Sequence, residues 1–315
     1  EIRPRDWSSD VCSSDLALVL AIMVAVGLFL TIQAMQALRR TGLSFLTTTE
    51  WQPDSGKFGI AAVLFGTVLI AVVAVAIALP ISLGTALFIT EIAPKWMRST
   101  LVALVDLMAA VPSVVYGLWG LFLLQGNIVG LSRWINTYLG WLPFFKVTGA
   151  DPGSPLSSAS VYTASTFIAG VVVAMMVMPI QCVVMREVFS QVPAGEREGA
   201  YALGSTRWGM IRVVSIPFGR GGIIGGTMLG LGRALGETIA VMLIISPRFD
   251  INFHVLEAGG NSVSSLIALR YSEASGFGLS ALMAAGLALF ALTIVVNFTA
   301  SWFVNRSRSG ASSEA

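Results

Sequence analysis

The stretch EGAYALGSTRWGMIRVVSIP, Glu198 to Pro217, is a polar segment between two long apolar runs. It belongs to a loop from Arg186 to Arg220 that carries five arginines. The loop has the composition of a soluble segment, and its pattern predicts two short helices around a turn. Gly204 is placed to end the first helix, because glycine readily adopts the left-handed conformation that often follows a helix.

The second predicted helix begins at Ser205 or Thr206, whose hydroxyl groups can cap it. It runs to about Val214, and Pro217 is expected to stop it before the next apolar run. This helix would present a basic and partly apolar surface that suits binding in a groove of a partner protein. The side chains expected on this surface are Arg207, Trp208, Met210 and Arg212.

The rest of the chain is strongly apolar. Of its 315 residues 55% are hydrophobic and only 11% are charged, whereas a soluble domain has roughly 25% charged residues. This composition excludes a soluble protein and predicts an all-α integral membrane protein. The net charge of +2 does not argue for a nucleic-acid partner. No cluster of His, Cys or carboxylate residues stands out in the sequence, so neither an enzyme nor a metal site is predicted.

Six transmembrane helices are predicted, because about 20 apolar residues cross a bilayer core of roughly 30 Å. One uncharged run, Phe58–Thr90, has 33 residues, which is too long for one upright span and too short for two. We expect a span to about Leu79 and a kinked or interfacial continuation at Pro80 and Gly84. The six predicted spans are Leu16–Leu38, Phe58–Leu79, Leu101–Leu124 around Pro112, Phe167–Met185, Gly221–Ile245 and Leu279–Val304.

The two ends of the chain are treated apart from this transmembrane domain, which covers residues 16–305. Residues 1–15 lack an initial methionine and repeat the tripeptide SSD, so we expect a non-native scar segment there. Residues 306–315 are expected to form a tail. Cytoplasmic loops carry an excess of Lys and Arg, so the arginine-rich loop 186–220 and both termini are predicted to face the cytoplasm. The loop from Gln125 to Ser160 is expected to lie on the opposite membrane surface.

A second stretch, LGLGRALGET at Leu229–Thr238, places Arg233 and Glu237 inside the fifth predicted span. A charge at that depth costs about 2.5–3.5 kcal/mol, so both side chains must face protein or water rather than lipid. On a continuous helix they would share one face with small residues that permit close packing of a neighbouring helix or leave room for a small solute. These small residues are Gly222, Gly226 and Gly230.

Two interpretations of this charged pair stay open. The pair could be an ion pair that holds helices together, although a buried pair is often no more stabilising than apolar residues of similar volume. Alternatively, it could line the path of a solute, since the planar fork of Arg233 suits oxyanions such as phosphate. Glu237 would then neutralise Arg233 in the empty state and weaken its grip on the anion. We favour the second interpretation.

The loop 186–220 resembles a known signature. Glu198-Gly199-Ala200, Gly204 and Val214-Ser215-Ile216-Pro217 are similar to the E-A-A…G…I-x-L-P signature of ABC importer permeases. In that family the segment is a coupling helix that docks on a separate ATPase subunit, so the resemblance implies a type I, MetI-like permease with six transmembrane helices. The expected coupling residues are Glu198, Ala200, Gly204 and Pro217, together with Arg207 from the basic surface of the second helix. The chain has no G-x-x-x-x-G-K-[ST] motif, so no cofactor is expected on it, and ATP and Mg²⁺ would bind the ATPase.

The stretch GLGRALGET, with VPSVVYGLWG at Val111–Gly120, closely resembles the PstC-type permeases of phosphate importers. The resemblance covers about Leu16–Asn305, and the N-terminal segment departs from it. It implies a transport permease of the bacterial inner membrane that imports inorganic phosphate. The partners implied are a PstA-type sister permease, a PstB-type ATPase dimer and a PstS-type periplasmic phosphate-binding protein. By position, Arg233 and Glu237 match the intramembrane charged pair of that family.

Two other functions stay open beside the phosphate importer. The first is a permease for another oxyanion, such as molybdate or sulfate. The second is a proton-coupled secondary anion transporter, in which Glu237 would carry the proton. A proton-driven carrier has no use for an ATPase-docking helix, so the loop 186–220 argues against it.

Overall fold

The computed structural model describes residues 6–148 and 159–308, and most of these residues are helical. A small hairpin is formed by β1 (Trp51–Gln52) and β2 (Lys57–Phe58), which pair antiparallel with Trp51 opposite Phe58. Residues 245–262 form a long non-helical connection. The predicted all-α fold class is therefore confirmed. The backbone of residues 6–15 and 306–308 continues the first and last helices. The remainder of the predicted scar segment and tail lies outside the described residues.

Four helical stretches in the described residues are long and apolar enough to cross a membrane. They belong to α1 (Asp6–Thr41) with η1 (Gly42–Leu46), α2 (Ala61–Leu87) with η3 (Phe88–Ile92), α7 (Thr166–Ser190) and α14 (Gly276–Arg308). The central one is α7, which packs along α2 and α11. In the most apolar part of α7 67% of the residues are buried, against 6% for the first stretch. The first stretch therefore exposes apolar side chains around most of its surface, as expected of a helix in lipid.

The second predicted span has the expected continuation beyond Leu79. Helix α2 continues through Pro80 to Leu87, and the π-helix η3 extends it to Ile92. Proline removes one backbone hydrogen bond, but packing against neighbouring helices keeps a transmembrane helix intact, and α2 packs extensively on α7. The stretch Ala61–Ile92 has 32 residues, about 48 Å at 1.5 Å per residue. It therefore extends beyond the hydrocarbon core.

The third predicted span is broken at Pro112. Helix α3 (Lys95–Ala110) ends there, and α4 (Ser113–Trp119) continues through η4 (Gly120–Leu124) and α5 (Gln125–Asn127) at a bend of 89°. The cause is local, because the residue before a proline is pushed out of the helical region, and Val111 has ψ 129°. The described residues thus contain four spanning stretches, or five if this bent pair is one span, so the count of six is not confirmed.

The fifth predicted span is also interrupted. Helix α11 (Arg220–Leu235) ends before Gly236, and α12 (Ile239–Ile244) begins after Thr238. The prediction of a continuous helix over Gly221–Ile245 is therefore wrong. This interruption lies inside the stretch that carries the predicted charged pair.

Shorter elements complete the chain. The predicted surface loop after Gln125 contains α6 (Val129–Leu139), and its residues 149–158 lie outside the described part of the chain. Helix α13 (Val263–Arg270) precedes α14. The remaining short elements are η2 (Pro53–Ser55), η5 (Pro143–Phe145), η6 (Ala159–Val161) and η8 (Tyr271–Glu273).

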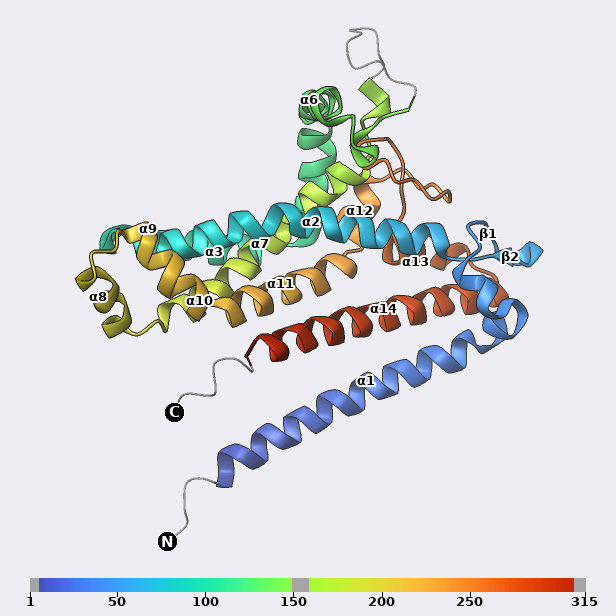
Figure 1. Cartoon of the computed structure of the whole chain (residues 1–315). Coiled ribbons are helices and arrows are strands. Elements are labelled where there is room, and N and C mark those ends of the chain that lie inside the picture. Colours follow the sequence, from blue (N-terminus) through green and yellow to red (C-terminus); the bar gives the residue numbers. More distant parts are fainter. Residues whose placement is uncertain (1–5, 149–158, 309–315) are drawn as a thin grey trace.

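The long helices separate two ends of the molecule (Figure 1). One end holds α8 (Ala194–Ala202) and α9 (Arg207–Met210), and the other holds β1, β2 and α13. The start of α1 and the end of α14 lie toward the α8 end (Figure 1). Both ends of the described chain thus lie on the side of the arginine-rich loop.

Candidate functional site

The loop 186–220 folds as the predicted pair of short helices. Gly204 turns the chain between α8 and α9 with φ +83°, in the left-handed region. Thr206 caps α9, because its Oγ1 accepts a hydrogen bond from the backbone N–H of Gly209 at 3.2 Å. The local sequence therefore determines both the turn and the start of the second helix.

The second helix does not stop at Pro217, contrary to the prediction. After α9 the chain forms a π-helix, η7 (Ile211–Ser215), and then α10 (Ile216–Phe218), which contains the proline. Pro217 lies in the first turn of α10. Local π-helical turns can accommodate a proline within a continuing helix.

The surface of this loop combines exposed apolar side chains with a groove. Leu203, Val213 and Trp208 are 88%, 70% and 65% exposed. A groove of about 480 Å³ lies beside them, lined by Glu196, Gly199, Ala200, Leu203, Ser205, Val213, Val214, Pro217 and Phe218. Exposed apolar side chains around a groove favour an interaction site here.

The predicted coupling residues are distributed over this surface. Ala200 and Pro217 line the groove itself. Glu198, Gly204 and Arg207 are exposed beside it without lining it. The structure thus gathers all five at one tip of the molecule.

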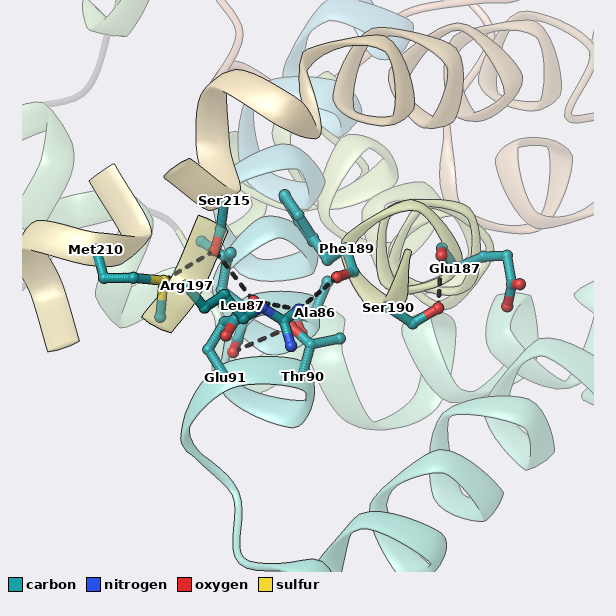
Figure 2. Close-up of polar contacts among 10 residues, drawn as sticks. All are labelled: Ala86, Leu87, Thr90, Glu91, Glu187, Phe189, Ser190, Arg197, Met210 and Ser215. Atoms are coloured by element: carbon teal, nitrogen blue, oxygen red, sulfur yellow. Dashed lines mark hydrogen bonds and ion pairs between the residues drawn. The ribbon is translucent and has the colours of Figure 1, made fainter. Parts of the chain in front are cut away.

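A buried carboxylate ties this loop to the end of α2 (Figure 2). The Glu91 side chain in η3 is only 4% exposed and lies 3.0 Å from Arg197 Nη2 of α8. Ser215 Oγ of η7 donates a hydrogen bond to Glu91 Oε1 at 3.0 Å. Arg197 Nη2 also donates to the backbone carbonyl of Phe189 near the end of α7, at 2.9 Å. We call Glu91, Arg197 and Ser215 the Glu91 cluster.

Sequence reasoning missed the Glu91 cluster. Only the end of the uncharged run at Thr90 was noted, and Ser215, the partner of Glu91, stands 124 residues later. A carboxylate directly after a long uncharged segment was the one available signal. Its partners could not be inferred from spacing, since only the fold brings them together.

The second candidate region is the interruption between α11 and α12. Glu237 lies in the interruption with 9% of its surface exposed. Its Oε1 accepts a hydrogen bond from the backbone N–H of Ala240 at 3.3 Å and so caps α12. Its backbone carbonyl accepts a 2.7 Å bond from Ser264 Oγ of α13. These contacts satisfy backbone groups that a broken helix leaves without partners.

The predicted pairing of Arg233 with Glu237 is wrong in this structure. No ion pair joins the two, both of which lie in the described part of the chain. The helix ends at Leu235, so the i, i+4 geometry that would align them is lost. Arg233 and Glu237 line the same pocket without forming an ion pair.

Arg233 is exposed in the last turn of α11, between two open pockets. One pocket, of about 450 Å³, is lined by Ser113, Gly232, Arg233, Gly236, Glu237, Thr238 and Ile239. The other, of about 490 Å³, is lined by Ile180, Gly225, Met228, Leu229, Gly232, Arg233, Asn297 and Ser301. Arg233 borders both pockets, so its guanidinium is accessible to an anion in either.

The glycine ladder of α11 packs against α7. Gly222, Gly226 and Gly230 are buried. A Cβ atom at Gly222 would lie 2.6 Å from Val188, and one at Gly230 would lie 2.3 Å from Gln181 Nε2, both on α7. The structure therefore places the ladder against a neighbouring helix, the first of the two expected uses. Arg233 follows on the same face of α11, in its last turn, where it is exposed.

Comparison with protein families gives a match over most of the chain. Residues 78–309 match the family described as binding-protein-dependent transport system inner membrane component. The matched part contains the Glu91 cluster, the loop 186–220 and the interruption between α11 and α12.

Curated relatives are similar over nearly the whole length. The phosphate transport system permease protein PstC of Xylella fastidiosa (strain Temecula1) is 39% identical over 281 residues, covering 89% of this chain and 84% of the relative. PstC of Haemophilus influenzae is 39% identical over 283 residues, 89% of this chain and 86% of the relative. PstC 2 of Mycobacterium tuberculosis is 37% identical over 287 residues, covering 90% of this chain and 86% of the relative.

Solved structures show the same fold. A bacterial alginate ABC transporter, in complex with an alginate-bound periplasmic protein, has a chain that aligns with TM-score 0.60 and 16% identity, covering 96% of this chain and 98% of that one. A chain of the MetNI methionine ABC transporter in an inward-facing conformation aligns with TM-score 0.52 and 16% identity. The alignment covers 77% of this chain and 93% of that one. Both similarities concern the fold alone.

Proposed function

The chain belongs to the family of binding-protein-dependent transport system inner membrane components, and from that premise we propose that it imports inorganic phosphate as one permease of an ATP-driven complex. It is a transport permease subunit, not an enzyme. The relatives named PstC support phosphate as the solute, because they are 37–40% identical over most of both chains. The observation that carries the proposal is the accessible guanidinium of Arg233 between two open pockets.

The ATPase partner is a PstB-type dimer that docks on the loop 186–220. Leu203, Trp208 and Val213 are exposed around a groove, and exposed apolar surface of this kind is typical of an interaction site. The short helices α8 and α9 suit insertion into a groove on the partner. ATP and Mg²⁺ bind that partner, which puts the α8 end of this chain in the cytoplasm.

The phosphate path runs past Arg233, in a channel completed by a PstA-type sister permease. Arginine suits this role because its planar donors match the oxygens of phosphate. Arg233 has no carboxylate partner among the described residues, so its charge is available to the solute. Glu237 acts on the path through the backbone, since it caps α12 and so maintains the interruption that opens the pocket.

The remaining partner is a PstS-type periplasmic phosphate-binding protein, which delivers the solute at the end that holds β1, β2 and α13 (Figure 1). Both termini then face the cytoplasm, and the complex resides in a bacterial inner membrane.

The proposal is tested by uptake of radiolabelled phosphate into vesicles that hold this chain, the sister permease and the ATPase. Binding protein is added outside and ATP inside, and an ionophore collapses the proton gradient. We expect uptake that requires ATP and that excess sulfate or molybdate does not inhibit. Uptake only with an intact proton gradient would contradict the ATP-driven importer, and inhibition by molybdate or sulfate would contradict phosphate selectivity.

A further inference from the structure

The Glu91 cluster connects the docking surface to a membrane span. Arg197 belongs to α8, which carries part of the groove, and Glu91 belongs to η3, the direct continuation of α2. The two side chains meet at 3.0 Å, and the Glu91 side chain is 4% exposed. Figure 2 shows the arginine reaching across to the carboxylate and to the carbonyl of Phe189.

The burial of the Glu91 carboxylate within the protein requires an explanation. The span Ala61–Ile92 has 32 residues, and the bilayer core needs only about 20, so Glu91 lies where water could solvate it. The fold instead encloses it and supplies Arg197 and Ser215 as partners. A buried charge is tolerated only when it is paired and hydrogen-bonded. The enclosure of Glu91 therefore indicates that the fold maintains its contacts with Arg197 and Ser215, rather than merely tolerating a charge.

Two residues of the Glu91 cluster lie in segments with an unusual backbone. Glu91 lies in the π-helix η3 and Ser215 in the π-helix η7. Such segments are rare and are found frequently at functional sites. Thr90 Oγ1 donates to the carbonyl of Ala86 at 3.0 Å, so a backbone acceptor next to the wider turn is satisfied. Two π-helical segments thus aim their polar side chains at one point.

The span that Glu91 terminates leads to the anion pockets. Helix α2 packs along both α7 and α11, and α11 carries Arg233 in its last turn. A displacement of α8 that pulls on Arg197 would therefore move α2, and α2 would move against α11. Packed cores respond to such a displacement as rigid units rather than by gradual deformation.

We infer that Glu91 is a positioning residue that transmits movement of α8 to α2, with Arg197 as its partner. The inference rests on the proposed function, because it requires the ATPase to dock on the loop 186–220. Without the ion pair the ATPase still binds the exposed surface, but its movement no longer reaches the spans. ATP is then hydrolysed without import.

The test measures phosphate imported and ATP hydrolysed in the same vesicles. Glu91→Gln and Arg197→Gln remove the ion pair and keep much of the side-chain shape. We expect the ratio of phosphate to ATP to fall about ten-fold in each, within the range for residues that couple two sites, while the ATPase still co-purifies. Glu187→Gln is the matched control, because Glu187 is exposed at the same end of α7 and points away from the cluster (Figure 2). It should leave the ratio unchanged.

A charge swap separates coupling from folding. Glu91→Arg combined with Arg197→Glu restores a pair of opposite charges, and we expect it to recover part of the ratio. An unchanged ratio in both single variants would overturn the inference. Loss of the assembled complex in both, without recovery in the swap, would also overturn it, because the pair would then serve folding alone. If the wild-type chain gives no ATP-dependent uptake, the proposed function fails instead.

Discussion

The loop between α8 and α10 and the interruption between α11 and α12 each break a helix at a glycine, but for different reasons. Gly204 has φ +83°, a conformation that glycine adopts without strain. Gly236 has ordinary right-handed geometry with φ −91°. There the break is stabilised by remote contacts, because Ser264 bonds to the carbonyl of Glu237. The first interruption is local in origin and the second is tertiary.

The arginines of the two regions also differ, because one is paired with a carboxylate and the other is not. In the loop, Arg197 is bound to the buried Glu91, so its charge is used within the fold. At the interruption, Arg233 is exposed between two pockets and has no ion pair in the described residues. Paired charges hold elements together, whereas an unpaired charge in a pocket is available for a solute. The comparison therefore assigns coupling to one region and anion contact to the other.

The largest expected effect is at Arg233. Arg233→Gln removes the only charge among the described residues that borders both pockets. It should slow ATP-dependent phosphate uptake about 10- to 100-fold, the size of a lost hydrogen bond to a charged group. Uptake into vesicles measures the effect, and Arg233→Lys should retain more of the activity. Normal uptake by the glutamine variant would remove Arg233 from the path.

A smaller loss is expected at Gly204. Gly204→Ala places a side chain at φ +83°, which costs about 1–2 kcal/mol and shifts α8 relative to α9. We expect weaker retention of the ATPase during purification of the complex, while phosphate binding at the pockets is unaffected. Full retention at low ATPase concentration would argue that the turn does not position the docking surface.

Glu237 should matter through its cap rather than through Arg233. Glu237→Ala removes the acceptor for Ala240 N–H and should destabilise the protein by about 0.5–2 kcal/mol, as for other lost helix caps. Glu237→Gln keeps an oxygen at that position and should cost less. Thermal unfolding in detergent compares the two variants. If the glutamine variant were as impaired as Arg233→Gln in uptake, the charge of Glu237 would have a direct role.

The smallest effect has the opposite sign. Gly199→Ala lies inside α8, where an added Cβ meets nothing within 4 Å, and should stabilise that helix by about 0.5–1 kcal/mol. It is also the matched counterpart of Gly204→Ala, since the same change is made at a helical and at a left-handed position. ATPase retention should be equal to or better than that of the wild-type chain. Reduced retention would show that the groove requires the space at Gly199.

The sequence was sufficient for features that depend on local chemistry. The apolar runs predicted the four spanning stretches found in the described residues, and Gly204 with Thr206 predicted the turn and cap of the loop. The sequence did not predict features that depend on contacts between residues far apart in the chain. Helix α2 passes through Pro80 because α7 supports it, and Glu237 leaves the helix because contacts to α12 and α13 hold it there. The 89° bend at Pro112 likewise divides the span predicted over Leu101–Leu124.

The candidate site divides in the same way. Arg233 was identified from the cost of a charge in an apolar run, which needs no knowledge of its neighbours. The partners of Glu91 were not identified, because Arg197 and Ser215 are brought to it only by the packing of α8 and η7 against the end of α2. Long-range ion pairs leave no spacing signal in a single sequence.

The most direct test of the separation between the two regions is a parallel measurement of phosphate uptake and ATPase retention for Arg233→Gln and Gly204→Ala. We expect Arg233→Gln to lose uptake and keep the ATPase bound. Gly204→Ala should lose bound ATPase, and its uptake should fall only in proportion to the ATPase that is lost. If Arg233→Gln released the ATPase, or if both variants lost the two quantities in the same proportion, the division into a coupling region and an anion-contact region would be wrong.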